Sequence, residues 1–454
     1  MDLLRLATAG SVDDGKSTLI GRLLYESGSV PKDKLAAIEA ASRRRGAEGL
    51  DLSLLTDGLI AEREQGITID VAHVYFATPT RRYIIADTPG HVEYTRNMVT
   101  GASTASVSVI LIDARNGLLE QTHRHYYISA LLRIPTVVVA INKMDLVDYS
   151  QTRFDEIAAA FRAMAAPVQP AGQTLRIMPV SSLHGENITR RSAHLDWYDG
   201  PTLLEVLETA DAHQRSTLPG RLQIQRVLRP RNEGALDIRS YAGRIASGTF
   251  RVGDAVTVLP GGRQTRISAL AHLGTPVEAA EAGQSVSVDF VDDVDVGRGS
   301  LVVPTPPEGR VGTTGPTSSL LPDGEGEGRT GRPGPAQLPS ARQQLDATVC
   351  WLDEQPLRLG RVYLVQHGVQ RVRAKVTAIT GLVDVSTLQI GAPPDTLQLN
   401  QLATVSLKLA EPVVVDAYEE NPPNGAFIVV DADTSATAAV GFVAADRPAA
   451  DDDF

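Results

Sequence analysis

Residues 10–17, Gly-Ser-Val-Asp-Asp-Gly-Lys-Ser, decide how the first half of the chain folds. They separate an apolar run typical of a buried strand, LLRLATA, from an amphipathic run typical of a helix, STLIGRLLYE. A glycine-rich loop between a strand and a helix directs backbone N–H groups toward phosphate at the positive end of the helix. The spacing GxxxxGK[ST] in this context predicts a P-loop nucleotide-binding domain, and a chance glycine turn is a much weaker interpretation.

Two side chains of this loop have specific roles in the prediction. Lys16 is expected to reach the β- and γ-phosphates, which also makes it a catalytic candidate, and Ser17 is expected to ligate Mg²⁺. The other loop residues expected to contact the nucleotide are Gly10, Ser11, Val12, Asp13, Asp14, Gly15 and Thr18.

A second motif, Asp87-Thr88-Pro89-Gly90, follows the apolar run YIIA. A carboxylate at a strand end can hold Mg²⁺ through water, and the Gly90 amide can meet a γ-phosphate. We expect Thr88 and Pro89 to line the same site. The pattern DxxG alone is usually an ordinary turn, but after a P-loop it becomes specific for a nucleoside triphosphate site.

A third motif, Asn142-Lys143-Met-Asp145, follows the strand-like run TVVVAI and indicates the base. Asp145 can accept hydrogen bonds from both N1–H and the N2 amino group of guanine. Adenine lacks these donors, so it would leave the carboxylate desolvated and unpaired at a cost of about 1–3 kcal/mol. Asn142 and Lys143 are expected to brace the loops beside the base. An NKxD at an ordinary helix start is frequent by chance, but three motifs in this order predict a GTP site.

Two further segments complete the predicted site. Ser181, Ser182 and Leu183 follow the strand-like run RIMPV and are expected to place a backbone N–H near guanine O6. Residues 62–70, EREQGITID, lie between the P-loop and Asp87. Thr68 can donate its amide to the γ-phosphate and its hydroxyl to Mg²⁺ only while GTP is bound, so it is a metal and catalytic candidate in a segment that hydrolysis releases. The alternative interpretation of residues 62–70 is a turn that leads into a strand, because β-branched residues follow.

The pattern of residues changes at four points along the chain. Residues 1–212 alternate helical patterns with continuous apolar runs, such as 83–86, 107–112 and 136–141, which suit a mostly parallel sheet with helices on both faces. Residues 213–303 and 344–443 consist of short β runs separated by glycine turns, and each segment predicts a β-barrel. Residues 304–343 are rich in Gly, Pro, Ser and Thr and predict a flexible linker, and residues 444–454 predict an acidic tail. The expected fold class is thus an α/β P-loop GTPase domain followed by two all-β barrels.

Composition narrows the functional classes. The 454 residues suit roughly three domains at about 150 residues each, and the net charge of −11 disfavours a general nucleic-acid or membrane-surface binder. The single cysteine, Cys350, excludes an internal disulfide, and its apolar surroundings predict a buried, inert thiol in a reducing compartment. No run reaches the roughly 20 apolar residues of a membrane span, and the first residues read as a strand rather than a signal peptide. We therefore expect a soluble, cytoplasmic protein.

Together these motifs resemble the translation-factor class of GTPases, through GSVDDGKS, EREQGITID, DTPGHVEYTRNM, NKMD and the later SSL. The segment GRIASGTFRVGDAVTVLP extends the resemblance into a second domain similar to the β-barrel of those factors. Within the class, the chain resembles the GTPase large subunits of bacterial sulfate adenylyltransferase, with Asp14 where elongation factors usually have histidine. Further matching stretches are YISALLRIPTVVVAINKMDLVDY, RPRNEGALDIRSYAG, CWLDEQPL and DAYEENPPNGAFIVVD.

The resemblance implies a mechanism. In this family GTP hydrolysis drives the unfavourable attack of sulfate on ATP, which gives adenylylsulfate and pyrophosphate, and a separate smaller subunit performs the adenylyl transfer. GTP and Mg²⁺ are the implied cofactors, and a hetero-oligomer with that subunit is the implied assembly. His91, next to Gly90, matches the residue that positions the attacking water, and Val12 and Ile67 match the apolar gate beside it. Some relatives carry a fused adenylylsulfate kinase, which is not expected here because the sequence contains one P-loop.

Two other functions compete with this interpretation. A translation elongation factor that delivers aminoacyl-tRNA is the alternative, but Asp14, the acidic charge and the last hundred residues favour sulfate activation. A scaffold locked by GTP without turnover is disfavoured because His91 and Thr68 are both present. Sulfate as the substrate rests on the resemblance alone.

Overall fold

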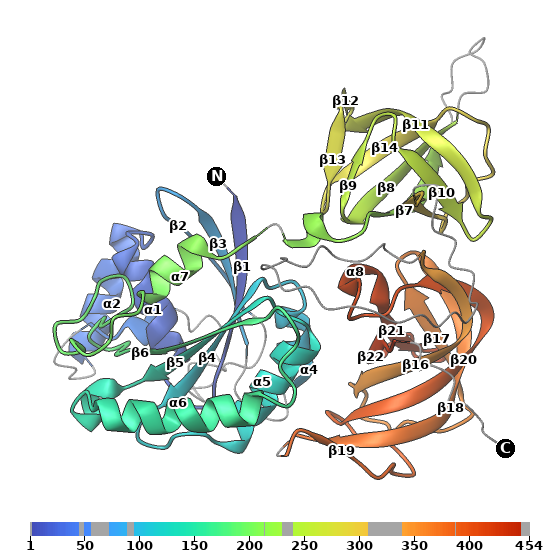
Figure 1. Cartoon of the computed structure of the whole chain (residues 1–454). Coiled ribbons are helices and arrows are strands. Elements are labelled where there is room, and N and C mark those ends of the chain that lie inside the picture. The colour runs from blue at the N-terminus through green and yellow to red at the C-terminus, as the bar shows by residue number, and fades with distance from the viewer. Residues whose placement is uncertain are drawn as a thin grey trace, which may run out of the picture.

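The computed structural model describes residues 2–44, 50–55, 72–88, 95–212, 214–228, 239–306, 338–385 and 387–445. They form an α/β domain followed by two all-β domains, so the predicted fold class is confirmed (Figure 1). Most of the predicted linker, residues 307–337, and the end of the predicted tail, residues 446–454, lie outside the described residues. Among the helices that are described, none is both long and apolar enough to cross a membrane.

The sheet of the first domain has the strand order β2-β3-β1-β4-β5-β6, in which only β2 runs antiparallel to its neighbour. Its strands are β1 (Leu3–Ala9), β2 (Ala72–Ala77), β3 (Arg82–Asp87), β4 (Val107–Asp113), β5 (Thr136–Asn142) and β6 (Thr174–Pro179). The three apolar runs expected as strands are β3, β4 and β5. Every residue of β4 is buried, as a strand between two helical layers requires.

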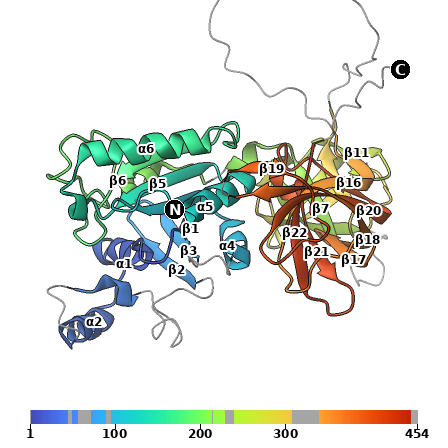
Figure 2. The ribbon, with the colours of Figure 1, turned by 90° about the horizontal axis from the view of Figure 1, so that it is seen from below.

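Two helical layers cover this sheet. Alternate residues of β4 face opposite layers, since Ile110 and Ile112 pack with one apolar cluster and Val109 and Leu111 with the other. The first layer holds α4 (Thr95–Ala102), α5 (Glu120–Leu131) and α6 (Gln151–Ala165). The second holds α1 (Lys16–Glu26), α2 (Lys32–Arg44), α7 (Leu203–Thr209) and the 3-10 turn η1 (Leu52–Leu55). Figure 2 shows α6 and α1 on opposite sides of the sheet.

The second domain is an antiparallel barrel with the order β10-β15-β7-β8-β14-β11, which closes where β10 pairs with β11. Its strands are β7 (Arg221–Leu228), β8 (Ser240–Ser247), β9 (Thr249–Arg251), β10 (Ala255–Leu259), β11 (Arg263–His272), β12 (Thr275–Pro276), β13 (Ala279–Glu281), β14 (Ser285–Phe290) and β15 (Leu301–Pro304). The turn η4 (Gln214–Thr217) precedes it.

The third domain is also a barrel, with the order β17-β21-β22-β16-β20-β18, and it closes where β17 pairs with β18. Its elements are β16 (Ser340–Trp351), β17 (Val362–His367), β18 (Gln370–Asp384), β19 (Gln389–Gly391), β20 (Leu402–Val415), α8 (Pro422–Gly425), β21 (Ala426–Asp431) and β22 (Thr437–Val443). Burial alternates along β18, which places one row of side chains inside the barrel.

A buried ion pair joins the two barrels. Arg221 donates to both carboxylate oxygens of Asp416, from Nε at 2.8 Å and from a terminal nitrogen at 2.7 Å. Both side chains are only 3% exposed. Asn424 donates a further hydrogen bond to Asp416 at 2.8 Å, so the carboxylate is well satisfied despite its burial. Planar, two-point pairing of this kind fixes the orientation of one barrel against the other.

We expect Arg221→Ala to destabilise the pair of barrels by about 3–5 kcal/mol, because it leaves the Asp416 carboxylate buried without its cation. Urea denaturation followed by tryptophan fluorescence would measure the loss, since Trp351 lies in the third domain. The matched control is Glu156→Ala, which removes an exposed ion pair with Arg153 and should cost less than about 1 kcal/mol. Equal, small effects of the two variants would show that Arg221 is not needed for the interface.

The third domain also packs against the α/β domain. Cys350 is fully buried, as predicted, and it belongs to the same apolar cluster as Ile128 of α5. Burial raises the pKa of the Cys350 thiol to about 12, so the thiol is protonated and unreactive at neutral pH. Tyr418 donates its hydroxyl to the carbonyl of Leu132 at 3.1 Å, at the end of α5. The helix α5 therefore links the nucleotide-binding domain to the third domain.

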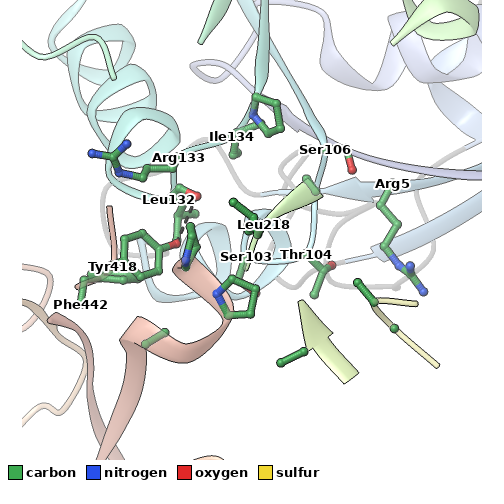
Figure 3. Close-up of a pocket in the computed structure, with 18 of the residues that line it drawn as sticks. Arg5, Ser103, Thr104, Ser106, Leu132, Arg133, Ile134, Leu218, Tyr418 and Phe442 are labelled. Atoms are coloured by element: carbon green, nitrogen blue, oxygen red, sulfur yellow. Dashed lines mark hydrogen bonds between the residues drawn. The ribbon is translucent and has the colours of Figure 1, made fainter. Parts of the chain in front are cut away.

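A cavity of about 830 Å³ lies where the three domains meet (Figure 3). Leu132 and Ile134 of the first domain, Leu218 before β7, and Tyr418 and Phe442 of the third domain line it. The cavity lies away from the P-loop, so we treat it as a junction between domains and not as part of the nucleotide site.

Candidate nucleotide-binding site

The P-loop runs from the end of β1 to the first residue of α1, as the sequence predicts. Its turn needs unusual backbone angles, with φ of 68° at Asp13 and 95° at Gly15. A Cβ atom at Gly15 would lie 2.5 Å from Nδ2 of Asn142. Glycine is therefore required here, both for its positive φ and for the close approach of the loop after β5.

Lys16 lies inside the loop and is only 8% exposed. Its Nζ donates to the carbonyl oxygens of Gly10 at 2.8 Å and Ser11 at 3.2 Å. Burial lowers the pKa of Lys16, and the nearby carboxylates of Asp87 and Asp14 oppose that shift. A buried ammonium group at the start of a helix is arranged to receive an anionic group such as a phosphate.

Asp14 shapes the P-loop from within. It is 3% exposed, and its carboxylate accepts a hydrogen bond from the Ser11 amide at 2.6 Å. Burial raises the pKa of Asp14, while the bond from Ser11 and the charge of Lys16 act in the opposite direction. The Asp14 side chain thus fixes the position of the Ser11 amide within the loop.

Hard oxygen donors suited to Mg²⁺ lie next to the P-loop. Asp87 ends β3, is 2% exposed, and accepts a hydrogen bond from the Thr8 hydroxyl at 3.0 Å. The two residues are neighbours in the parallel register of β1 and β3. Thr88 donates its hydroxyl to the Thr8 carbonyl at 2.6 Å, which fixes the chain as it leaves the strand. Carboxylate and hydroxyl oxygens from Asp87 and Ser17 fit the ligand preference of Mg²⁺.

Asn142 ties three loops together. Its Nδ2 donates to the Asp14 carbonyl at 2.7 Å, and its Oδ1 accepts from both the amide and the hydroxyl of Ser182 at 2.9 Å. The side chain is 1% exposed, so it is a structural bridge rather than a surface group. The P-loop, the loop after β5 and the loop after β6 are therefore held as one unit.

Asp145 is oriented by the loop after β6. Its Oδ1 accepts a hydrogen bond from the Ser181 hydroxyl at 2.6 Å. The second oxygen, Oδ2, lies 3.9 Å from Nε2 of His184. The serine fixes the plane of the carboxylate, which is the group expected to read the guanine edge.

Asp113 is a site residue that the sequence motifs do not include. It ends β4 and lies opposite Asn142 in the parallel register of β4 and β5. Its carboxylate contacts Nζ of Lys143 at 3.0 Å and the guanidinium of Arg115 at 2.6 Å. Although burial acts to raise it, these bonds lower the pKa of Asp113 to about 2. An acidic residue at the end of a mostly apolar strand was the sequence signal that could have identified it.

The described part of the site brings together most of the predicted residues at the carboxyl ends of β1, β3, β5 and β6, the expected ligand edge of a parallel sheet. Val12, expected to flank the attacking water, is 40% exposed at the P-loop. Thr68, Ile67, Pro89, Gly90 and His91 lie outside the described residues. The described residues contain no group of His, Cys, Asp or Glu side chains with the spacing of a separate metal site.

Comparison with known families agrees with this site. The protein-family model for the elongation factor Tu GTP binding domain matches residues 1–215. The family model for the GTP-eEF1A C-terminal domain-like region matches residues 344–444. The fold and the site define a translation-factor-class GTPase.

The curated relatives are more specific. Sulfate adenylyltransferase subunit 1 of Citrobacter koseri is 43% identical, over 97% of this chain and 86% of the relative. Subunit 1 of Aeromonas hydrophila is 42% identical over the same shares. The bifunctional enzyme CysN/CysC of Mycobacterium tuberculosis strain H37Rv is 46% identical, over 98% of this chain and 67% of the relative. The chain belongs to the sulfate adenylyltransferase subunit 1 family.

The base contact can be tested by changing its chemistry. In Asp145→Asn an amide group replaces one acceptor with a donor, which suits the C2 carbonyl of xanthine. We expect GTP affinity to fall roughly 10–100-fold and xanthosine triphosphate affinity to rise, as measured by competition with a fluorescent guanine nucleotide. Asp148→Asn, an exposed position of the same loop, is the matched control. A variant that still prefers GTP would remove Asp145 from base recognition.

Proposed function

We propose that the chain is the GTPase subunit of a sulfate adenylyltransferase. A sulfate oxygen attacks the α-phosphorus of ATP on a second, smaller subunit, which forms adenylylsulfate and releases pyrophosphate. GTP hydrolysis on the present chain drives that unfavourable transfer. The observation that carries the proposal is the single unit formed by P-loop, Asn142 and Asp145 in a chain with 42–46% identity to subunit 1 relatives.

The roles of the site residues follow from phosphoryl transfer, which depends mainly on positioning and charge stabilisation. Lys16 binds the β- and γ-phosphates and stabilises the charge that develops during transfer. Ser17, Thr68 and Asp87 would hold Mg²⁺, with Asp87 acting through water. His91 positions the attacking water and need not be a strong base. Mg²⁺ neutralises the phosphate oxygens when it is bound.

The other residues of the site hold the nucleotide. Asp145 reads guanine, and Asn142 and Lys143 brace the loops around the base. Backbone and side-chain contacts to GTP come from Gly10, Ser11, Val12, Asp13, Asp14, Gly15, Thr18, Thr88, Pro89, Gly90, Ser181, Ser182 and Leu183. We place the reaction in the cytoplasm, where ATP and GTP are available and where the Cys350 thiol stays reduced.

The experiment that tests the proposal combines the chain with the smaller subunit of a subunit 1 relative. The two proteins should copurify, and the complex should release pyrophosphate from ATP and sulfate faster when GTP is added. An elongation factor would instead retain aminoacyl-tRNA on a filter in a salt-dependent manner. Retention of tRNA without GTP-dependent pyrophosphate release would favour that alternative and overturn the proposal.

A further inference from the structure

Asp113 occupies a central place at the base end of the nucleotide site. It is 2% exposed and lies beside Asn142, whose carbonyl accepts a hydrogen bond from the Ala114 amide at 2.9 Å. Arg153 donates to the Ala114 carbonyl at 2.8 Å and to that of Arg115 at 3.1 Å. The loop that carries Asp113 is thus fixed on both sides, and the position of its carboxylate is well defined.

The Lys143 side chain is paired with the Asp113 carboxylate. Its backbone φ is 61°, an uncommon value for a residue with a side chain, so the lysine is held in a fixed and costly conformation. Its Nζ donates to the Asp13 carbonyl in the P-loop and lies 3.0 Å from Oδ2 of Asp113. Among the described residues, Asp113 is the only carboxylate within ion-pair distance of this ammonium group.

We propose that Asp113 is a positioning residue that sets how long a guanine nucleotide stays bound. Its charge holds the Lys143 ammonium between β4 and the P-loop, and this keeps the P-loop and the base loop in register around the nucleotide. The inference rests on the proposed GTP binding and extends it to a residue outside the three motifs. Since GTP and GDP share the base, Asp113 acts on both nucleotides and not on the chemical step.

A purely structural role is the competing interpretation. Asp113 also accepts a hydrogen bond from the Arg115 amide at 2.9 Å, the pattern of an Asx turn, and pairs with the Arg115 side chain. Asp113→Asn separates the two roles, because asparagine keeps an acceptor for the Arg115 amide but removes the charge that holds Lys143. The matched control is Arg115→Ala, which removes the other partner of Asp113 and leaves the Lys143 pair intact.

The test uses the full chain and measures release of a fluorescent GDP analogue, steady-state GTP hydrolysis and the melting temperature. We expect Asp113→Asn to release GDP roughly tenfold faster and to raise KM with kcat unchanged, the pattern of lost uniform binding. Arg115→Ala should release GDP within about twofold of the wild-type rate. Asp113→Glu, which keeps the charge, should restore most of the residence time.

Three results would overturn the inference. The first is a GDP release rate from Asp113→Asn within twofold of the wild-type rate. The second is a fall in kcat of Asp113→Asn with KM unchanged. The third is an acceleration of GDP release by Arg115→Ala as large as that by Asp113→Asn. If Asp113→Asn does not fold, Asp113→Ser keeps the turn acceptor and is judged by the same criteria. If the wild-type chain shows no preference for guanine nucleotides, the proposed function itself fails. If the wild-type chain binds GTP normally and the Asp113 variants release GDP at the wild-type rate, only the role of Asp113 is rejected.

Discussion

The variant His91→Ala is expected to keep its affinity for GTP within a few-fold while hydrolysis slows by roughly 10²–10⁴, the usual range for a group that positions a proton transfer. The imidazole is assigned to the attacking water and not to the nucleotide, so binding and turnover should separate. The measurements are the GTP dissociation constant and the rate of phosphate release on the same preparation.

The control for this variant is His272→Ala, a histidine of β11 in the second domain, which should leave both quantities unchanged. Normal phosphate release from His91→Ala would remove His91 from the mechanism. Slow release with undiminished adenylylsulfate yield would retain His91 but would remove hydrolysis as the driving force.

The second large effect is expected for Lys16→Ala. The buried ammonium is assigned two charge-assisted hydrogen bonds to phosphate, at about 1.5–3 kcal/mol each. Their loss should weaken GTP binding by roughly 10²–10⁴ and abolish measurable hydrolysis. Equilibrium binding of a fluorescent GTP analogue and phosphate release would measure both.

Lys32→Ala is the matched control, because it removes the same charge from an exposed position on α2. It should bind and hydrolyse GTP as the wild type does. If Lys16→Ala binds GTP with unchanged affinity and turns it over normally, the P-loop assignment is wrong.

The features that were predictable from sequence are those encoded by contiguous residues. The P-loop between β1 and α1 and the buried strands β3 to β5 follow from local patterns of glycine and apolar residues. The two β domains follow from their short runs and glycine turns. The roles of Thr68 and His91 remain predictions, since both residues lie outside the described part of the chain.

Contacts between distant parts of the chain could not be predicted in this way. Arg221 and Asp416 are 195 positions apart, and neither lies in a motif. Asp113 became part of the site only through its register with Asn142 and its distance to Lys143. Such pairs depend on how strands and domains are placed in space, and a single sequence carries no periodic signal for that placement.

The central claim is that hydrolysis, and not the mere presence of GTP, drives adenylyl transfer. The most direct measurement is the final yield of adenylylsulfate from ATP and sulfate by the two-subunit complex, with GTP and with a non-hydrolysable GTP analogue. We predict that GTP raises the yield above the ATP–sulfate equilibrium in step with the phosphate released, while the analogue leaves it at equilibrium. An equal yield with GTP and with the analogue would contradict the account.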